Sequence, residues 1–135
     1  MKNKTQQILQ TLRTAGERIT PFRQTLVEIL IKAKSPLSAL EIQKKVTANK
    51  TTIYRELQFL VKNKIAEEVW LGTTPLRYEI TESHHHHLVC VKCQKVSDIE
   101  FSTHLEDQER QILKRKKFKV LNHALEFFGL CNNCQ

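Results

Sequence analysis

Apolar residues recur at helical spacing in the first part of the chain. One amphipathic segment runs from Lys4 to Thr14, and Gly16 ends it. A second begins at Thr20-Pro21, where the hydroxyl can cap the first turn and proline suits the first helical position. The two apolar stripes are formed by Ile8, Leu9 and Leu12, and then by Phe22, Leu26, Ile29 and Leu30. This spacing predicts two helices, each with one buried face.

Two further helices are predicted before residue 64. Ser35-Pro36 interrupts the pattern, and Ser38 is placed to cap a short helix. A longer helix is predicted from Asn49 to Asn63. The apolar residues of these two helices are Leu40, Ile42 and Val46, and then Ile53, Leu57, Leu60 and Val61.

Two short strands then read as a hairpin. Residues 67–71 and 76–80 form them, and residues 72–75 form the turn. Helices followed by a two-stranded wing describe a winged helix-turn-helix, in which the helix before the wing enters the DNA major groove. The outward residues of that helix's first turns are Lys50, Thr51, Thr52, Tyr54, Arg55 and Gln58. The competing interpretation is a solvated helix face, because cationic surface helices are common.

The second half of the chain opens with an extended run, residues 84–93. Alternate side chains of a strand point to opposite faces, so His84 and His86 face one way while His85 and His87 face the other. One strand can then serve two separate metal sites. A histidine run can also be an expression tag, but this run is internal and leads directly into a Cys-x-x-Cys pair.

The four cysteines of the chain form two Cys-x-x-Cys pairs, Cys90 with Cys93 and Cys131 with Cys134. Four thiolates are the ligand set of a closed tetrahedral zinc site. Two disulfides would need an oxidising compartment, and the sequence begins without an apolar signal segment, so a cytoplasmic protein is expected. A thioredoxin-type redox motif would need only one pair. Structural zinc can contribute about 10–16 kcal/mol of folding free energy, which a short domain with little core needs.

The rest of the second half predicts a helix and strands. The helix, Thr103 to Lys117, has Leu105, Ile112 and Leu113 on its inward face. Its basic end, residues 114–117, is favoured by the helix dipole and reads as a solvated helix end rather than a nucleic-acid contact. Residues 118–128 supply alternating and aromatic strand material that suits a dimer interface.

Charge separates the two halves. The 135 residues carry a formal net charge of +8. Residues 1–83 hold +6 of it without any Cys or His, and residues 84–135 hold +2. We therefore expect a module for a polyanion at 1–82 and a metal-binding module at 83–135. No apolar run is long enough to span a membrane, and neither a membrane nor a small organic substrate is expected as a partner.

Six pieces of the sequence, in their order and spacing, carry a resemblance to a known family. They are Arg18-Ile-Thr-Pro-Phe-Arg23, Thr51-Thr-Ile-Tyr-Arg55, Arg77-Tyr-Glu79, the block from His84 to Cys93, Asn122-His123 and the final Cys-x-x-Cys. With them the chain resembles, over essentially its whole length, the ferric uptake regulator family of bacterial metal-dependent repressors. The resemblance implies an α+β fold, with an N-terminal winged helix-turn-helix and a small C-terminal α/β dimerisation domain that holds structural zinc.

The resemblance also implies partners and contacts. A homodimer would bind an operator of double-stranded DNA with two-fold symmetry when loaded with a divalent metal. Tyr54 and Arg55 match the family's base-contacting pair, and Arg18 matches a basic residue that reaches an adjacent minor groove. The neighbouring Lys50, Thr51 and Thr52 are predicted to contact DNA as well, with Lys50 at a phosphate.

Three metal sites follow from the same resemblance. The four cysteines match the structural zinc site. The regulatory site would match Glu79, His85 and His87 with Asp98, or less favourably Glu100, and a second site would match His84, His86, Glu106 and His123. Imidazole and carboxylate ligands suit Fe²⁺, Zn²⁺ and Mn²⁺ alike, as well as Ni²⁺. The chain departs from the family at Ser35-Pro36, where many members carry a histidine, so the link of the regulatory site to the first domain rests on Glu79.

Three alternatives to a repressor of metal uptake remain at this point. One is a peroxide-responsive repressor of the same family, acting through bound iron. Another is a zinc enzyme that activates water, although the sequence has no His-Glu-x-x-His and its basic first half would be unexplained. The third is an RNA-binding zinc module, which would not depend on dyad-symmetric duplex DNA.

Overall fold

The chain folds into two compact units, residues 1–82 and 83–135. The structure is a computed structural model and describes residues 2–72, 75–82, 84–102 and 105–135. The first unit contains α1 (Lys2–Thr14), α2 (Pro21–Lys32), β1 (Leu37–Ser38), α3 (Ala39–Gln43), α4 (Lys50–Lys62), β2 (Ala66–Val69) and β3 (Arg77–Ile80). The second contains β4 (His86–Cys90), β5 (Val96–Ile99), α5 (Glu106–Lys116) and β6 (Glu126–Gly129). No helix in these described ranges is long and apolar enough to cross a membrane.

Side-chain caps set the starts of three helices in the first unit. The Thr20 hydroxyl accepts a hydrogen bond from the Arg23 N–H at 3.1 Å, and Pro21 is the first residue of α2. Ser38 and Glu41 exchange two hydrogen bonds in a capping box at the start of α3. Asn49 caps α4 in the same way, through the Thr52 N–H at 2.8 Å. Local sequence therefore fixes where these helices begin.

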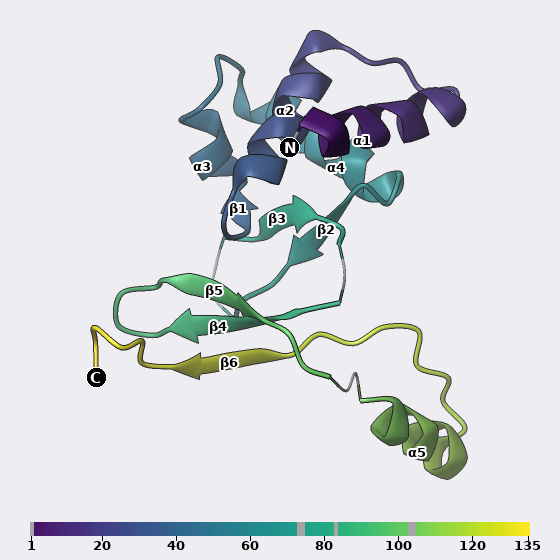
Figure 1. Cartoon of the computed structure of the whole chain (residues 1–135), viewed down its shortest axis with the longest axis vertical. Coiled ribbons are helices and arrows are strands. Elements are labelled where there is room, and N and C mark those ends of the chain that lie inside the picture. The colour runs from purple at the N-terminus through teal and green to yellow at the C-terminus, as the bar shows by residue number, and fades with distance from the viewer. Residues whose placement is uncertain (1, 73–74, 83, 103–104) are drawn as a thin grey trace. The chain divides into compact units, whose positions relative to one another are not determined.

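The apolar stripes of the helices meet in one core above a three-stranded sheet (Figure 1). Ile53, Leu57 and Leu60 of α4 are fully buried, as their helical spacing predicts. The remaining core residues are Leu12, Leu26, Val27, Leu30, Ala39, Ile42, Ile65, Ala66, Tyr78 and Ile80. Because one face of α4 is buried here, its opposite face is left toward solvent.

The sheet of the first unit has the strand order β1-β3-β2, with antiparallel neighbours. The hairpin of β2 and β3 is the predicted wing, although the strands are shorter than expected and Thr73 and Thr74 of the predicted turn lie outside the described residues. The additional strand β1 pairs Leu37 with Tyr78. Side chains alternate along β3, so Tyr78 enters the core while Glu79 lies on the other face of the sheet.

An ion pair joins α2 to α4. The Arg23 guanidinium donates to both carboxylate oxygens of Glu56, at 2.9 and 3.3 Å, and lies over the Phe59 ring at 3.4 Å. Only 11% of the Arg23 side chain and 13% of the Glu56 side chain are exposed. A bidentate pair with so little solvent around it fixes the position of α4 against α2.

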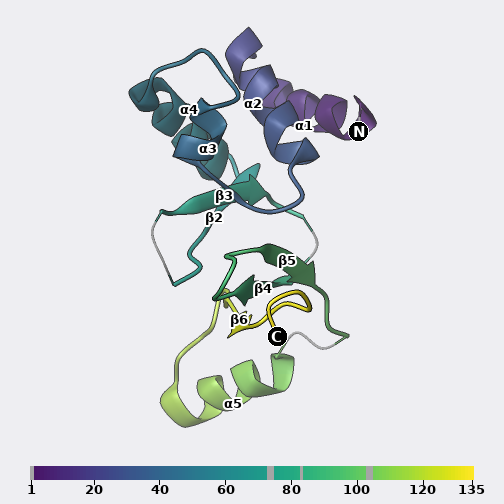
Figure 2. The same cartoon turned by 90° about the vertical axis from the view of Figure 1, so that its left-hand side faces the viewer.

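The second unit is built on a three-stranded sheet of order β5-β4-β6. β4 runs antiparallel to β5 and parallel to β6. The register places His87 opposite Asp98 on one side and opposite Glu126 on the other. In Figures 1 and 2, α5 lies on the β6 side of this sheet.

Two expectations for the second unit are wrong. Ile112 and Leu113 were predicted to face inward, but they are 39% and 48% exposed, and none of the residues of α5, all of them described, is buried. The physical reason is that, within the described part of this unit, no apolar layer covers the helix. Of residues 118–128, only Glu126 onward form a strand, because the preceding residues connect α5 back to the sheet. The predicted helix start, Thr103 with His104, lies outside the described residues.

The ion pair between Arg23 of α2 and Glu56 of α4 leads to a prediction about the free energy of unfolding. Glu56→Ala should lower the free energy of unfolding by about 2 kcal/mol, because Arg23 loses charge-assisted hydrogen bonds in a nearly solvent-free position. Glu82→Ala is the matched control, since it removes an acid that pairs with Lys4 and is 49% exposed, and should cost at most about 0.5 kcal/mol. Denaturant unfolding followed by circular dichroism measures both. Equal losses in the two variants would contradict this account.

Candidate metal centres and DNA-reading helix

The four cysteines form one cluster at the end of the second unit. Their sulfur atoms all lie within 4.8 Å of one another, and Cys93 Sγ is 3.8 Å from Cys131 Sγ. A tetrahedral zinc with bonds of about 2.3 Å to sulfur places its ligands about 3.8 Å apart. None of the four is in a disulfide. The spacing therefore fits a shared metal ion.

Hydrogen bonds within the two Cys-x-x-Cys turns shape this cluster. The Gln94 N–H donates to the Cys90 carbonyl at 2.8 Å, and the Cys134 N–H donates to the Cys131 carbonyl at 2.9 Å. The parallel pairing of β4 with β6 brings the two turns together, with Cys90 opposite Gly129. The Cys131 N–H then reaches Cys90 Sγ at 3.4 Å.

The thiols of the cluster differ in acidity. Backbone N–H groups, first that of Cys131 and then that of Cys93, lower the pKa of Cys90 to about 6. The pKa of Cys134 is raised to about 12, chiefly by its hydrogen bond with the Cys131 side chain and then by burial. Several thiolates this close repel one another unless a cation lies among them. A divalent metal supplies that charge, and its binding would displace the remaining thiol protons.

Three histidines gather on one face of the second unit. The rings of His84 and His86 lie 4.7 Å apart, and the His123 ring lies 4.6 Å from that of His84 and 5.8 Å from that of His86. Each ring offers a nitrogen within 4.8 Å of the others. His86 is 2% exposed. Three imidazoles that converge in this way can hold a divalent transition metal.

The acid predicted for this cluster, Glu106, is exposed at the first residue of α5 and does not belong to the group of converging atoms. Glu109 lies one helical turn later, and its Oε1 is 2.7 Å from His123 Nδ1. The sequence reading missed Glu109. Its spacing of three residues from Glu106 puts both on one helix face, which is the signal that could have found it.

A second group lies on the other face of β4. The rings of His85 and His87 lie 5.0 Å apart, and His87 Nε2 is 3.8 Å from Asp98 Oδ1. All three residues offer ligand atoms within 4.8 Å of one another. His87 is 6% exposed, whereas the Asp98 side chain is 48% exposed. The alternation of the histidines along the strand is thus as the sequence predicts.

Glu79, the remaining predicted ligand, belongs to the first unit. It lies on the face of β3 that does not enter the core, and its half-buried side chain is opposite Glu67 of β2. That face of the wing therefore carries two carboxylates, those of Glu67 and Glu79.

The exposed face of α4 carries the residues predicted to contact DNA. Lys50, Thr51, Tyr54 and Arg55 are exposed, and Thr52 is half-buried. The Lys50 ammonium lies 5.8 Å from the Tyr54 ring centroid. One turn later in α4, the Gln58 side chain donates a hydrogen bond to the carboxylate of Glu68 in the wing at 2.8 Å, which links the helix to the wing. Arg18, before α2, is also exposed.

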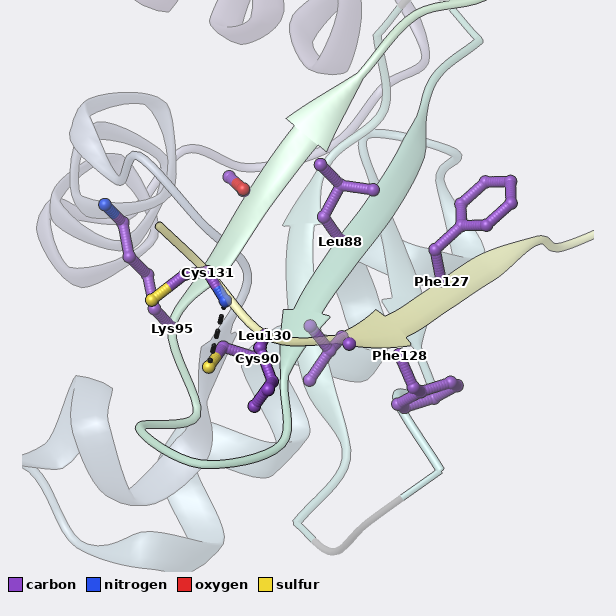
Figure 3. Close-up of a pocket in the computed structure, with 10 residues that line it drawn as sticks. Leu88, Cys90, Lys95, Phe127, Phe128, Leu130 and Cys131 are labelled. Atoms are coloured by element: carbon purple, nitrogen blue, oxygen red, sulfur yellow. Dashed lines mark hydrogen bonds between the residues drawn. The ribbon is translucent and has the colours of Figure 1, made fainter. Parts of the chain in front are cut away.

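An apolar groove runs along the sheet of the second unit. Figure 3 shows it, with Cys90 and Cys131 at one end and the rings of Phe127 and Phe128 at the other. Phe127 and Phe128 are 42% and 53% exposed, and Leu130 is 50% exposed. Exposed apolar side chains such as these mark a place where another protein surface can pack.

The fold and these centres define a winged-helix protein with candidate sites for metal. The family model described as the ferric uptake regulator family matches residues 14–128. The chain belongs to this family.

Curated relatives match along nearly the whole chain. The ferric uptake regulation protein of Bacillus subtilis (strain 168) is 32% identical over 144 residues, which cover 99% of this chain and 96% of that protein. The peroxide-responsive repressor PerR of Staphylococcus aureus (strain NCTC 8325 / PS 47) is 29% identical over 140 residues, covering 100% of this chain and 94% of that protein.

Solved structures share the fold. The Vibrio cholerae ferric uptake regulator Fur superposes with a TM-score of 0.73 and 27% identity, covering 90% of this chain and 98% of that one. The Helicobacter pylori regulator Fur, described as having three functional metal binding sites, superposes with a TM-score of 0.74 and 24% identity. That alignment covers 98% of this chain and 92% of that one.

Proposed function

We propose that this protein is a metal-responsive repressor that binds palindromic operator DNA as a homodimer when loaded with a divalent metal, and so controls the uptake of iron or zinc. As a family member it is a transcriptional regulator and not an enzyme. The observation that carries the proposal is the presence, in one chain, of three clusters of metal-binding side chains and a capped helix with an exposed Tyr54-Arg55 face.

The cysteine cluster holds structural zinc in this proposal. Four sulfurs at zinc spacing, with backbone N–H support for the Cys90 thiolate, are the supporting observations. The zinc ties β4 to the segment after β6. Four reduced cysteines also fit a cytoplasmic protein.

The switch is assigned to His85, His87 and Asp98 together with Glu79. A ligand shifts a conformational equilibrium only by its differential affinity for the two states. A metal held by the second unit alone therefore cannot favour one arrangement of the DNA-binding unit, whereas a metal that also binds Glu79 can. Residues 1–83 contain no Cys or His, which leaves carboxylates as the strongest ligands there.

A second divalent metal is assigned to His84, His86 and His123, with Glu106 retained as the proposed fourth ligand. Mixed imidazole and carboxylate ligands bind Fe²⁺ and Zn²⁺, and also accept Mn²⁺. Metal analysis of protein purified from its native host, before and after mild chelation, identifies the ions.

The dimer is assigned to the exposed apolar residues of the second unit. Phe127, Phe128 and Leu130 are exposed along its groove, and Ile112 and Leu113 are exposed on α5. A two-fold pair of these faces would bury the apolar surface that the single chain leaves in water. It would also present two copies of α4 to two half-sites of one duplex.

DNA recognition is assigned to α4 and to Arg18. Arg55 can donate to a guanine edge, and Tyr54 can pack against a thymine methyl or a base face. Lys50, with Thr51 and Thr52 beside it, suits phosphate contacts at the start of the helix. Arg18 reaches an adjacent minor groove. The formal charge of +6 on residues 1–83 supports association with a polyanion.

The first prediction from the proposed function concerns structural zinc. Cys93→Ser should remove the tightly held zinc and with it the dimer and much of the folded second unit, because zinc binding and folding are coupled there. Metal analysis and sedimentation measure the two losses. Lys92→Ser in the same turn is the control and should keep both. A stable, dimeric, zinc-free Cys93→Ser protein would refute the assignment.

The second prediction separates base contacts from phosphate contacts. Arg55→Ala should weaken binding by about 1–3 kcal/mol per half-site and relax base preference, whereas Lys50→Ala should weaken all sequences alike and reduce the salt dependence. Fluorescence anisotropy with palindromes selected from a random duplex pool measures both. Lys62→Ala, at the far end of α4, is the control. If Arg55→Ala kept both affinity and preference, α4 would not read the bases.

The third prediction tests the switch. Glu79→Ala should keep structural zinc, the dimer and some metal at His85 and His87, yet remove most of the metal-induced gain in DNA affinity. DNA titrations of metal-free and metal-loaded protein give the gain as a ratio. Glu67→Ala is a matched control, since it removes the cross-strand neighbour of Glu79. An unchanged ratio in Glu79→Ala would move the switch to the site of His84, His86 and His123.

A further inference from the structure

The contact between His123 and Glu109 joins the segment that precedes β6 to helix α5. His123 Nδ1 lies 2.7 Å from Glu109 Oε1, and the two side chains are 18% and 31% exposed. The Glu109 N–H donates to the Leu105 carbonyl at 2.9 Å, which holds Glu109 in the first turn of α5. A short contact with limited solvent around it is a defined hydrogen bond rather than a surface ion pair.

This hydrogen bond determines which ring nitrogen of His123 is free to bind metal. A carboxylate accepts hydrogen bonds, so the neutral imidazole tautomer that suits this contact carries its proton on Nδ1 and its lone pair on Nε2. His123 Nε2 is buried, and among the described residues it has no hydrogen-bond partner. The ring itself packs against those of His84 and His86. A buried acceptor without a donor is costly unless a ligand completes it.

We infer that Glu109 is the positioning residue of the second metal site. It fixes the tautomer and orientation of His123 so that Nε2 faces the ion held with His84 and His86. A carboxylate on the far nitrogen also raises the basicity of the ligating one. The inference rests on the proposed second site, and it gives α5 a role distinct from the direct ligation proposed for Glu106.

The position of α5 depends on the same contact. None of the helix's residues is buried, so the Glu109–His123 contact is not accompanied by an enclosed apolar face of α5. The Glu109–His123 hydrogen bond links the helix to the residues that lead into β6. Metal binding at His123 and the orientation of α5 are therefore coupled through one carboxylate.

The test measures metal affinity rather than DNA binding. The dimer with its structural zinc in place is titrated with Zn²⁺ in competition with a chromophoric chelator. Glu109→Ala should weaken the second site about 10–100-fold, since loss of an outer carboxylate has this effect on metal affinity. Glu109→Gln, which can still accept from Nδ1, should lose less. Asp107→Ala on the same turn of α5 is the control, because it pairs with Arg110 on the surface, and should leave the affinity unchanged.

A comparison of single and double variants tests whether Glu109 affects metal affinity through His123. In a His123→Ala background, Glu109→Ala should cause no additional loss, because its partner is absent. Nitrogen NMR of the metal-free protein gives an independent readout. His123 should be protonated at Nδ1 in the wild type and should lose this preference in Glu109→Ala, a change that a purely structural role of Glu109 would not produce.

The outcomes separate the inference from the proposed function. If His123→Ala leaves the second-site affinity unchanged, the proposed site itself is wrong. If His123→Ala weakens binding while Glu109→Ala behaves like Asp107→Ala, the site stands and the role of Glu109 is overturned. Loss of an oxygen ligand from a bound Co²⁺ ion in Glu109→Ala, detected by X-ray absorption, would also overturn it, because Glu109 would then bind the metal directly.

Discussion

The two-residue repeat of a β-strand is the constraint on which the metal chemistry of this protein depends. Four consecutive histidines leading into β4 cannot all face one ion, because successive side chains point to opposite faces. The result is two imidazole pairs, with ring separations of 4.7 and 5.0 Å, on the two sides of the strand. A shift of register by one residue would exchange the two pairs, so the pairing of β4 with β5 and β6 determines which histidines belong to which candidate site.

The same strand ends in the cysteine cluster, which makes its register hard to alter. Cys90 closes β4, and the parallel pairing with β6 sets it against the turn that begins at Cys131. A metal among the four sulfurs would therefore fix the strand at one end while the histidines bind at the other. The proposed structural and sensing sites thus lie toward opposite ends of β4, a strand of five residues.

Local sequence accounts for much of the fold. Thr20-Pro21, Ser38 and Asn49 cap helices where the sequence places their starts, and the apolar stripe of α4 is buried as its spacing predicts. The pairing of strands that lie far apart in the sequence could not be predicted in the same way. The two residues of β1 carry no periodic signal and become a strand only by pairing with Tyr78.

The candidate sites show the same division. The alternation of the histidines and the two Cys-x-x-Cys pairs can be read directly from the sequence. The contact of Glu109 with His123 could not, because it joins a helix to a segment that follows it in the chain and depends on how the two are packed. The exposure of Ile112 and Leu113 has a similar origin, since an amphipathic pattern predicts a buried face but does not say which surface covers it.

The parallel pairing of β4 and β6 also bears on the order in which the molecule is assembled. Its register joins residues 87 and 126, so the loop between them must close before these contacts form, just as the loop between Leu37 and Tyr78 must close in the first unit. Non-local pairing slows folding, and local contacts speed it. The two units differ instead in when their strands are synthesised. Residues 1–82 contain every strand of their own sheet and are made first, whereas β4 must wait for β6 near the end of the chain. A newly made chain is therefore expected to fold its basic unit before its metal-binding unit.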